Sequence, residues 1–323
     1  MTVGDVTERD LVARIQRHLA PAPDWLLVGI GDDAAVVEPE RNRVEVLTVD
    51  ALVDGVHFDR AFVPPDAIGH RALAVNLSDL ASMGAAPRLA LLSMAMPSTL
   101  PLDDFDAIAA GFAALAARHR VHLVGGNLTR TPGPLMLDVT AVGTVKRRQA
   151  LTRAGARAGD EVYVSGSIGA AAAGLLSLKT TVCPSFSAVN TSTAERYLYP
   201  EPRVRLGTLL ARNRAATACV DLSDGLADGV HQLAASSGVG IAVDAAAIPV
   251  EGDVMRAITG GDDYELLFTA PPAADHQIRA IAHDLGLRLT AIGMVVAGSG
   301  VRVEGPAGQP LSLGAPGYRH FGS

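Results

Sequence analysis

Residues 67–96, AIGHRALAVNLSDLASMGAAPRLALLSMAM, carry the folding pattern on which the rest of the chain is built. The first part is mostly apolar over about five helical turns and ends at Gly84, since glycine commonly terminates a helix. The second part, residues 88–96, is a continuous apolar run of the length of a buried strand. We therefore expect a helix over residues 67–84, followed directly by a strand over residues 88–96.

Strands and helices alternate in the same manner on both sides of this stretch. In the first half we expect helices over residues 7–20 and 102–120 and strands over residues 25–30, 34–38, 43–49, 121–126 and 135–145. In the second half we expect helices over residues 168–178, 202–213, 224–238 and 275–286 and strands over residues 161–166, 218–223, 240–246, 264–270 and 289–296. This mixed alternation predicts an α/β fold in which helices pack on β-sheets.

A chain of 323 residues exceeds the size at which a single core usually stops growing, so we expect two domains. Residues 146–160, KRRQALTRAGARAGD, are basic, contain glycine and show no hydrophobic period, and we place the junction there. The predicted domains therefore span residues 1–147 and 148–323. Residues 179–194 are rich in Ser, Thr and Asn and are predicted to form an irregular surface loop.

The composition indicates a compact globular protein and excludes several functions. Hydrophobic residues make up 49% of the chain and charged residues 19%, and the net charge of −7 argues against a nucleic-acid-binding surface. No apolar stretch reaches the ~20 residues of a membrane helix, no signal peptide is evident, and the two cysteines give no disulfide framework. We therefore expect a cytoplasmic protein that binds neither nucleic acid nor membranes.

Lysine is nearly absent, and this restricts how the protein can bind phosphate groups. Only Lys146 and Lys179 are present, and the chain contains no Walker motif. Anionic substrates would therefore be bound by local arginines or by metal ions.

Acidic residues recur where strands end or inside apolar helices, and together they indicate a cation site. Asp79 is the hardest to explain otherwise, because an unpaired carboxylate on an apolar helix face is costly. Asp50 follows the strand predicted over residues 43–49, at the edge where open α/β sheets usually bind ligands. A series of carboxylates with little lysine to neutralise them favours hard divalent cations such as Mg²⁺, although carboxylates alone leave Ca²⁺ open. These acidic positions are Asp32, Asp33, Asp50, Asp79, Asp221, Asp224, Asp262 and Asp263.

Single positions also have ordinary structural explanations. Asp224 could equally cap the helix predicted over residues 224–238, and the paired aspartates could be turn residues. His57 is a lone histidine and Arg153 a basic residue at the domain junction, and most such residues pack or lie on the surface.

Eight motifs occur in order along most of the chain: GIGDDAAVV (29–37), TVDALVDGVHF (48–58), ALAVNLSDLASMGA (72–85), VGGN (124–127), ALTRAGARAGD (150–160), YPEPRVRLG (199–207), DLSDGLADG (221–229) and GGDDYELLFT (260–269). Together they resemble the thiamine-monophosphate kinase family of the aminoimidazole-ribonucleotide-synthase-like superfamily. The resemblance implies a two-domain synthase-like fold, with an N-terminal mixed-sheet domain that dimerises through its sheet and a C-terminal α/β domain. It also implies Mg²⁺-dependent transfer of the ATP γ-phosphoryl group to thiamine monophosphate, giving thiamine diphosphate and ADP.

Site residues are implied by the resemblance, position by position. Metal ligands are implied at Asp33, Thr48, Asp50, Asp79, Asp221 and Asp224, with the backbone of Leu47 as a further candidate. ATP contacts are implied at Gly126, Asn127, Arg153 and Ser223. Contacts to thiamine monophosphate are implied at His57, Asp262 and Tyr318. No residue is assigned as a general base, because the attacking phosphate oxygen is already largely deprotonated at neutral pH.

Three positions depart from the family pattern. Asn127 stands where the family usually has Asp; its amide oxygen could still ligate Mg²⁺, so Asn127 is also a candidate metal ligand, but one without charge. Leu47 replaces a hydroxyl residue common before Thr48, and Asp262 stands where Glu is usual.

Two alternatives to the kinase remain at this point. The first is a catalytically weakened homologue that still binds nucleotide and metal, with Asn127 as its mark. The second is another ATP-dependent synthase of the same superfamily, although the chain lacks the reactive cysteines that two such relatives carry near their termini.

Overall fold

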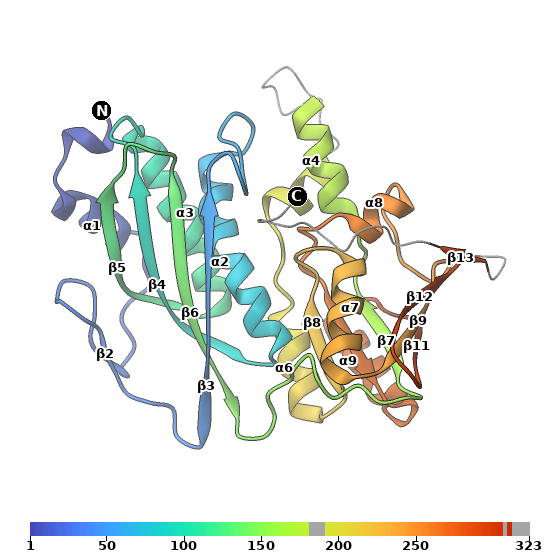
Figure 1. The fold of residues 1–323 in the computed structure, drawn as a ribbon. Helices are drawn as coiled ribbons and strands as arrows, with labels where there is room; N and C mark the ends of the chain where they lie inside the picture. The colour runs from blue at the N-terminus through green and yellow to red at the C-terminus, as the bar shows by residue number, and fades with distance from the viewer. Residues whose placement is uncertain (181–190, 306–308, 312–323) are drawn as a thin grey trace. The chain divides into compact units, whose positions relative to one another are not determined.

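The computed structural model describes residues 1–180, 191–305 and 309–311 of the chain (Figure 1). Two compact units are formed. The first contains Met1–Leu80 and Ala86–Arg147, and the second contains Ala81–Ala85 and the chain from Arg148 onward. Each unit is built around its own β-sheet.

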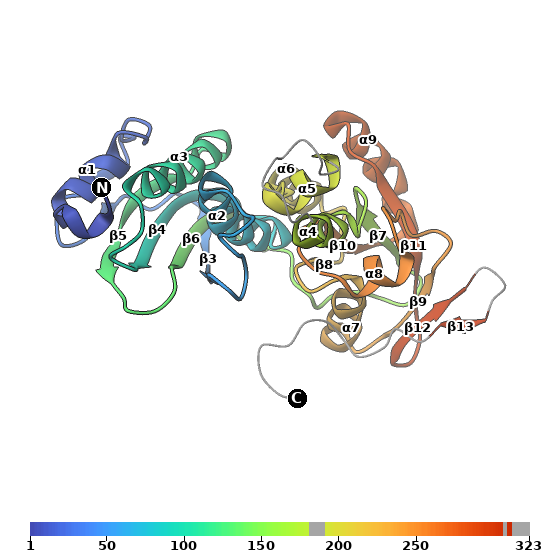
Figure 2. The ribbon, with the colours of Figure 1, turned by 90° about the horizontal axis from the view of Figure 1, so that it is seen from above.

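The first unit is a four-stranded mixed sheet with two long helices on one face (Figure 2). The strand order is β3-β6-β4-β5, and only β4 and β5 run parallel, because α3 connects them as a crossover. The sheet strands are β3 (Arg43–Val53), β4 (Ala86–Met96), β5 (His122–Arg130) and β6 (Met136–Lys146). The remaining elements are η1 (Val3–Asp5), α1 (Glu8–Gln16), α2 (Pro65–Ser82), α3 (Leu102–His119) and the small sheet of β1 (Leu26–Val28) and β2 (Val36–Val37).

Helix α2 is the centre of the first unit. Every residue from Ala67 to Ser82 is buried except Asp79, so the continuous apolar pattern reflects a helix covered on almost all sides. Gly84, whose φ is +68°, follows its end as the sequence predicts.

The second unit is a seven-stranded mixed sheet with helices on both faces. Figure 2 shows α7 on one side of the sheet and α6 and α9 on the other. The strand order is β13-β12-β9-β11-β7-β10-β8, and all neighbours are antiparallel except β12 and β9. Its core joins valines of β7 and β8 to apolar residues of α7, among them Leu226, Val230 and Leu233.

The strands of the second unit are β7 (Glu161–Ser165), β8 (Ala218–Asp221), β9 (Gly240–Asp244), β10 (Leu266–Ala270), β11 (Leu289–Val296), β12 (Gly300–Glu304) and β13 (Pro310–Leu311). Its helices are α4 (Ala170–Thr180), α5 (Thr191–Leu198), α6 (Val204–Asn213), α7 (Leu226–Ser237), α8 (Val254–Thr259), η3 (Pro272–Ala274) and α9 (Asp275–Leu285).

Several element boundaries differ from those predicted. The strand expected over residues 43–49 continues to Val53, because β3 pairs with β6 along its whole length. Part of the loop expected over residues 179–194 is helical, since α5 begins at Thr191; residues 181–190 lie outside the described residues. Helix α8 and strands β12 and β13 were not predicted, because short elements carry little periodic signal.

No helix in the described part of the chain has the length and apolar character needed to span a membrane.

Candidate functional site

The loop GIGDDAAVV gives its two aspartates different positions. Gly31 has a φ of +122°, a conformation that favours glycine, and the loop turns there. The Asp32 carboxylate accepts a hydrogen bond of 2.8 Å from the backbone N–H of Asp33. Both side chains are exposed, but one oxygen of Asp32 is engaged by the loop itself.

Thr48 and Asp79 are brought together from distant parts of the sequence. The Thr48 hydroxyl on β3 donates to the Asp79 carboxylate on α2 in a close hydrogen bond. Thr48 alternates with Leu47 and Val49, whose side chains are 66% and 59% exposed, so Thr48 faces the helices. Asp79 is the one residue of α2 between Ala67 and Ser82 that is not buried. Its carboxylate and the Thr48 hydroxyl therefore offer oxygen atoms at a partly exposed position.

Asp50 lies two residues after Thr48 and therefore points to the same face of the sheet. It stands inside β3, opposite Val139, and not at the end of the strand, so its predicted place at the strand edge was wrong. The strand is longer than its apolar alternation indicates because its pairing with β6 continues past the polar residue. Asp50 is half-buried.

Gly126 and Asn127 lie side by side on β5 but face opposite sides of the sheet. A Cβ on Gly126 would lie 1.9 Å from the Leu92 carbonyl oxygen, so only glycine permits this approach of β5 to β4. Across the sheet, Asn127 lies beside Ser93 on β4, which lies beside Asp138 on β6. Gly126 lies in the neighbouring row of cross-strand partners, which contains Asp50 on β3. Asn127 therefore lies on the face opposite the Thr48–Asp79 pair.

His57 follows β3 in a tight loop. Its Nδ1 accepts a hydrogen bond of 3.0 Å from the backbone N–H of Val53. This bond leaves the proton of a neutral ring on Nε2, which is therefore the nitrogen that can donate.

In the second unit, two segments carrying predicted site residues run side by side. The backbone N–H of Asp262 donates to the Ser223 carbonyl at 2.8 Å, and that of Tyr264 donates to the Leu222 carbonyl at 3.0 Å. A Cβ on Gly261 would lie 2.2 Å from the Ser223 carbonyl oxygen, which explains the glycine between these segments. The structure thus places Ser223 beside Asp262.

The other aspartates near this pair differ in burial. Asp221 ends β8 and is 6% exposed, and Asp224 is half-buried. Asp224 does not cap α7, which was one explanation for it in the sequence. The N-cap residue of α7 is Gly225, and no side chain forms a capping hydrogen bond.

Arg153 is exposed, and its carbonyl accepts a hydrogen bond from the Ser237 hydroxyl. Tyr318 lies outside the described residues.

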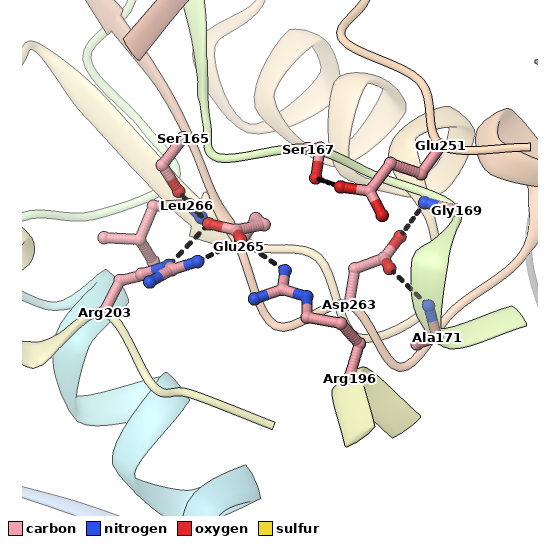
Figure 3. Close-up of polar contacts among 10 residues, drawn as sticks. All are labelled: Ser165, Ser167, Gly169, Ala171, Arg196, Arg203, Glu251, Asp263, Glu265 and Leu266. Atoms are coloured by element: carbon pink, nitrogen blue, oxygen red, sulfur yellow. Dashed lines mark hydrogen bonds and ion pairs between the residues drawn. The ribbon is translucent and has the colours of Figure 1, made fainter. Parts of the chain in front are cut away.

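A buried polar network beside this site was missed by sequence reasoning (Figure 3). Glu265 is fully buried and accepts hydrogen bonds from Arg196, Arg203 and Ser165. Asp263, 5% exposed, accepts from the backbone N–H groups of Gly169 and Ala171. One signal could have revealed Glu265: it is a charged residue within the apolar run YELLFTA.

Burial raises the pKa of Asp263 to about 6, while the two backbone N–H bonds and the charge of Arg196 act in the opposite direction. The carboxyl is therefore mostly ionised at neutral pH, and the two amides at the start of α4 stabilise that charge.

The donors available for a metal are all oxygen atoms, from carboxylates, a hydroxyl and an amide, and this set suits Mg²⁺. Among residues 1–180, 191–305 and 309–311, however, no three His, Cys, Asp or Glu side chains are grouped so as to hold a metal ion. Mg²⁺ is usually bound by one or two carboxylates together with substrate phosphates, so a cluster of three such side chains is not required.

Comparison with known proteins gives consistent matches over both units. Residues 31–145 match the family model "AIR synthase related protein, N-terminal domain", and residues 157–305 match "AIR synthase related protein, C-terminal domain". The chain is 35% identical over 304 residues to a thiamine-monophosphate kinase from Bacillus subtilis (strain 168), covering 91% of this chain and 93% of the relative.

Two solved structures are also similar. A thiamine-monophosphate kinase from Stenotrophomonas maltophilia K279a superposes with a TM-score of 0.83 at 40% identity, covering 92% of this chain and 96% of that one. A structure described as "AaThiL complexed with AMPPCP and TMP" gives a TM-score of 0.75 at 30% identity, covering 99% of both chains.

Proposed function

This chain belongs to the thiamine-monophosphate kinase family of AIR synthase related proteins, and from that membership we propose that it phosphorylates thiamine monophosphate with ATP. The products would be thiamine diphosphate and ADP. The observation that carries the proposal is the relative of 30% identity that was solved with AMPPCP and TMP, a pair that matches a nucleotide and a phosphorylated acceptor.

The reaction depends on positioning the two substrates and neutralising their phosphate charges more than on proton transfer. The attacking phosphate oxygen needs no strong general base, since the second phosphate pKa is about 6. The two substrates repel each other and must be held in line. The exposed Arg153 supports one phosphate contact, and the Nε2–H of His57 can donate to another.

We propose Mg²⁺ as the cofactor, held at the oxygen donors of the acidic positions together with the phosphates. When bound, Mg²⁺ would neutralise phosphate charge in a chain that has only two lysines. The proposed ligands are Asp33, Thr48, Asp50, Asp79, Asn127, Asp221 and Asp224, with the backbone of Leu47 as a further candidate. The close Thr48–Asp79 hydrogen bond supports the first-unit part of this set.

Asn127 offers a direct test of the metal proposal. Restoring a charge with Asn127→Asp should lower the Mg²⁺ concentration needed for half-maximal activity, because a carboxylate binds the cation more strongly than an amide. A titration of activity against Mg²⁺ measures the effect. An unchanged or raised requirement would show that this position, on the outer face of the sheet, is not a ligand.

For the substrates, we propose ATP contacts at Gly126, Asn127, Arg153 and Ser223 and thiamine monophosphate contacts at His57, Asp262 and Tyr318. The adjacency of Ser223 and Asp262 supports neighbouring nucleotide and acceptor sites in the second unit. We assign residues 1–147 to a domain that carries metal and ATP ligands, and residues 148–323 to a second domain. An ATP-consuming reaction suits the cytoplasmic location expected from the sequence.

We also propose that the chain forms a homodimer through the outer face of its four-stranded sheet. Leu47 and Val49 on β3 and Leu91 on β4 are 66%, 59% and 39% exposed on the face that α2 and α3 leave uncovered. Apolar side chains gathered on an open sheet face favour burial against a partner.

The proposed activity is tested by incubating the protein with ATP, Mg²⁺ and thiamine monophosphate and measuring thiamine diphosphate and ADP. Equal amounts of both products support the kinase. ATP binding without thiamine diphosphate would favour a catalytically weakened homologue, and ADP formation that needs a different acceptor would favour another synthase.

A further inference from the structure

The segment that carries Asp262 adopts an unfavourable backbone conformation. Asp262 and Tyr264 have φ values of +68° and +50°, in the left-handed region that non-glycine residues rarely adopt. Such a conformation persists only where the surrounding structure holds it, and it occurs often at functional sites. Residues 260–265, which join α8 to β10, must therefore be fixed by contacts outside the segment.

Asp263 supplies the first of these contacts. Its carboxylate is buried and accepts hydrogen bonds of 2.7 Å from the Gly169 N–H and 3.2 Å from the Ala171 N–H, at the start of α4 (Figure 3). The segment is thereby tied to a helix end whose free N–H groups favour an anion.

Glu265 supplies the second and larger set. Its carboxylate accepts hydrogen bonds of 2.6 Å from Arg203 Nε, 2.6 Å from Arg196 Nη2 and 2.5 Å from Ser165 Oγ, and Arg203 Nη2 makes a further close contact. The Ser165 hydroxyl also accepts from the Leu266 N–H at 2.9 Å. These bonds use nearly all the acceptor positions of one carboxylate. One buried side chain thus joins the ends of β7 and β10, helix α5 and the residue before α6.

The energetics of buried ion pairs argue that this network serves more than stability. Arg196 and Arg203 both bind the buried Glu265 carboxylate, and the charge of Arg196 also acts on Asp263, so two guanidinium groups face two carboxylates. Buried ion pairs of this kind often stabilise no more than apolar residues of similar volume would. What they do provide is fixed geometry, because the planar guanidinium of Arg203 binds a carboxylate in one orientation.

We propose that Glu265, held by Arg203 and Arg196 and assisted by Asp263, is a positioning residue that sets the conformation of residues 260–264. In this role it places Asp262 for thiamine monophosphate and, through the hydrogen bond from the Asp262 N–H to the Ser223 carbonyl, keeps Ser223 beside it. The assignment of Asp262 and Ser223 to the substrates rests on the proposed function; the control of the segment by Glu265 does not.

The decisive variant is Glu265→Gln, which keeps the shape of the side chain but removes the charge that orients both arginines. We expect kcat/KM for thiamine monophosphate to fall roughly ten- to a hundredfold, with KM for thiamine monophosphate rising more than KM for ATP. Arg203→Lys keeps the charge but cannot bind the Glu265 carboxylate in a bidentate manner. It should give a smaller loss of kcat/KM in the same direction. Arg279→Gln, which breaks an exposed ion pair with Asp275 in the same unit, is the control and should leave both KM values unchanged.

Amide hydrogen exchange by mass spectrometry gives a readout that needs no activity. In Glu265→Gln the N–H groups of Asp262 and Tyr264 should exchange faster than in the wild type, whereas Arg279→Gln should match the wild type. If Glu265→Gln does not fold, Arg196→Gln serves in its place, because it removes one donor and leaves the Arg203 pair intact.

Unchanged exchange in residues 260–264 together with unchanged KM values would overturn the proposal, as would a loss of kcat alone. A wild-type protein that makes no thiamine diphosphate would reject the proposed function, and the exchange comparison would still decide whether Glu265 holds the segment.

Discussion

Asp32 and Asp33 are neighbours in the sequence but differ in what their carboxylates can do. Asp32 accepts a hydrogen bond from the Asp33 N–H, and an asparagine there could still accept it. Asp33→Asn should lower kcat/KM by roughly a hundredfold or more, because it removes a negative charge proposed to bind Mg²⁺ beside the phosphates. Asp32→Asn should lower kcat/KM by roughly tenfold or less. Steady-state kinetics measure kcat/KM for both variants. Equal losses of kcat/KM would contradict the proposal that Asp32 and Asp33 have different roles.

The pKa of Asp263, raised by burial to about 6, predicts a pH dependence of stability. The folded state binds the proton more tightly than the unfolded chain, in which an aspartate has a pKa near 4. The contribution of Asp263 is therefore fully present below about pH 4 and decreases as pH rises to about 6, by up to about 3 kcal/mol.

Urea unfolding of the wild type and Asp263→Asn between pH 4 and pH 7 tests this prediction. Relative to the variant, the wild type should lose stability with rising pH up to about 6 and then stay level. A constant difference between the two proteins across this range would contradict it. Asp275→Asn, at the exposed ion pair with Arg279, is the matched control and should show no such slope.

At the scale of elements, helices α2 and α3 approach so closely that glycine is required on both. A Cβ on Gly69 would lie 1.9 Å from the Ile108 carbonyl oxygen, and one on Gly111 would lie 1.9 Å from the Asp66 carbonyl oxygen. Gly111→Ala should therefore lower the free energy of unfolding by ~1–3 kcal/mol through overpacking, even though alanine favours a helix by about 1 kcal/mol.

The single tryptophan, Trp25, lies in the first unit, so its fluorescence during urea unfolding reports on the unfolding of that unit. Ala114→Ser, on an exposed position of the same helix, is the control and should change stability little. A Gly111→Ala protein as stable as the wild type would show that the helices can separate at little cost.

Elements with long apolar patterns were predicted well, and short ones were not. Helix α2 and strand β4 follow their predicted ranges closely, because a buried element must be apolar along its length. Strand β3 was predicted too short because Asp50, a polar residue, interrupts the apolar alternation while the pairing with β6 continues. Helix α8 has six residues and gave no periodic signal.

At the scale of the whole molecule, the open sheet face predicts an oligomer. Leu47→Arg places a charge among the exposed apolar side chains of that face and should convert a dimer to a monomer. Sedimentation velocity measures this change as a lower sedimentation coefficient. Met294→Arg, at a residue of β11 in the second unit that is 50% exposed, should leave the dimer intact. A monomeric wild type, or a Leu47→Arg protein that remains a dimer, would remove the proposed interface.

The sequence by itself determined the α/β class and the family, because these depend on periodicity and on residue types at fixed spacings. It could not determine which acidic side chains would be paired. The Thr48–Asp79 bond, the exclusion of Asp224 as a helix cap and the network around Glu265 depend on tertiary structure. The physical reason is that the burial and partners of a carboxylate are set by side chains that lie far away in the sequence: 31 residues separate Thr48 from Asp79, and 62 separate Arg203 from Glu265.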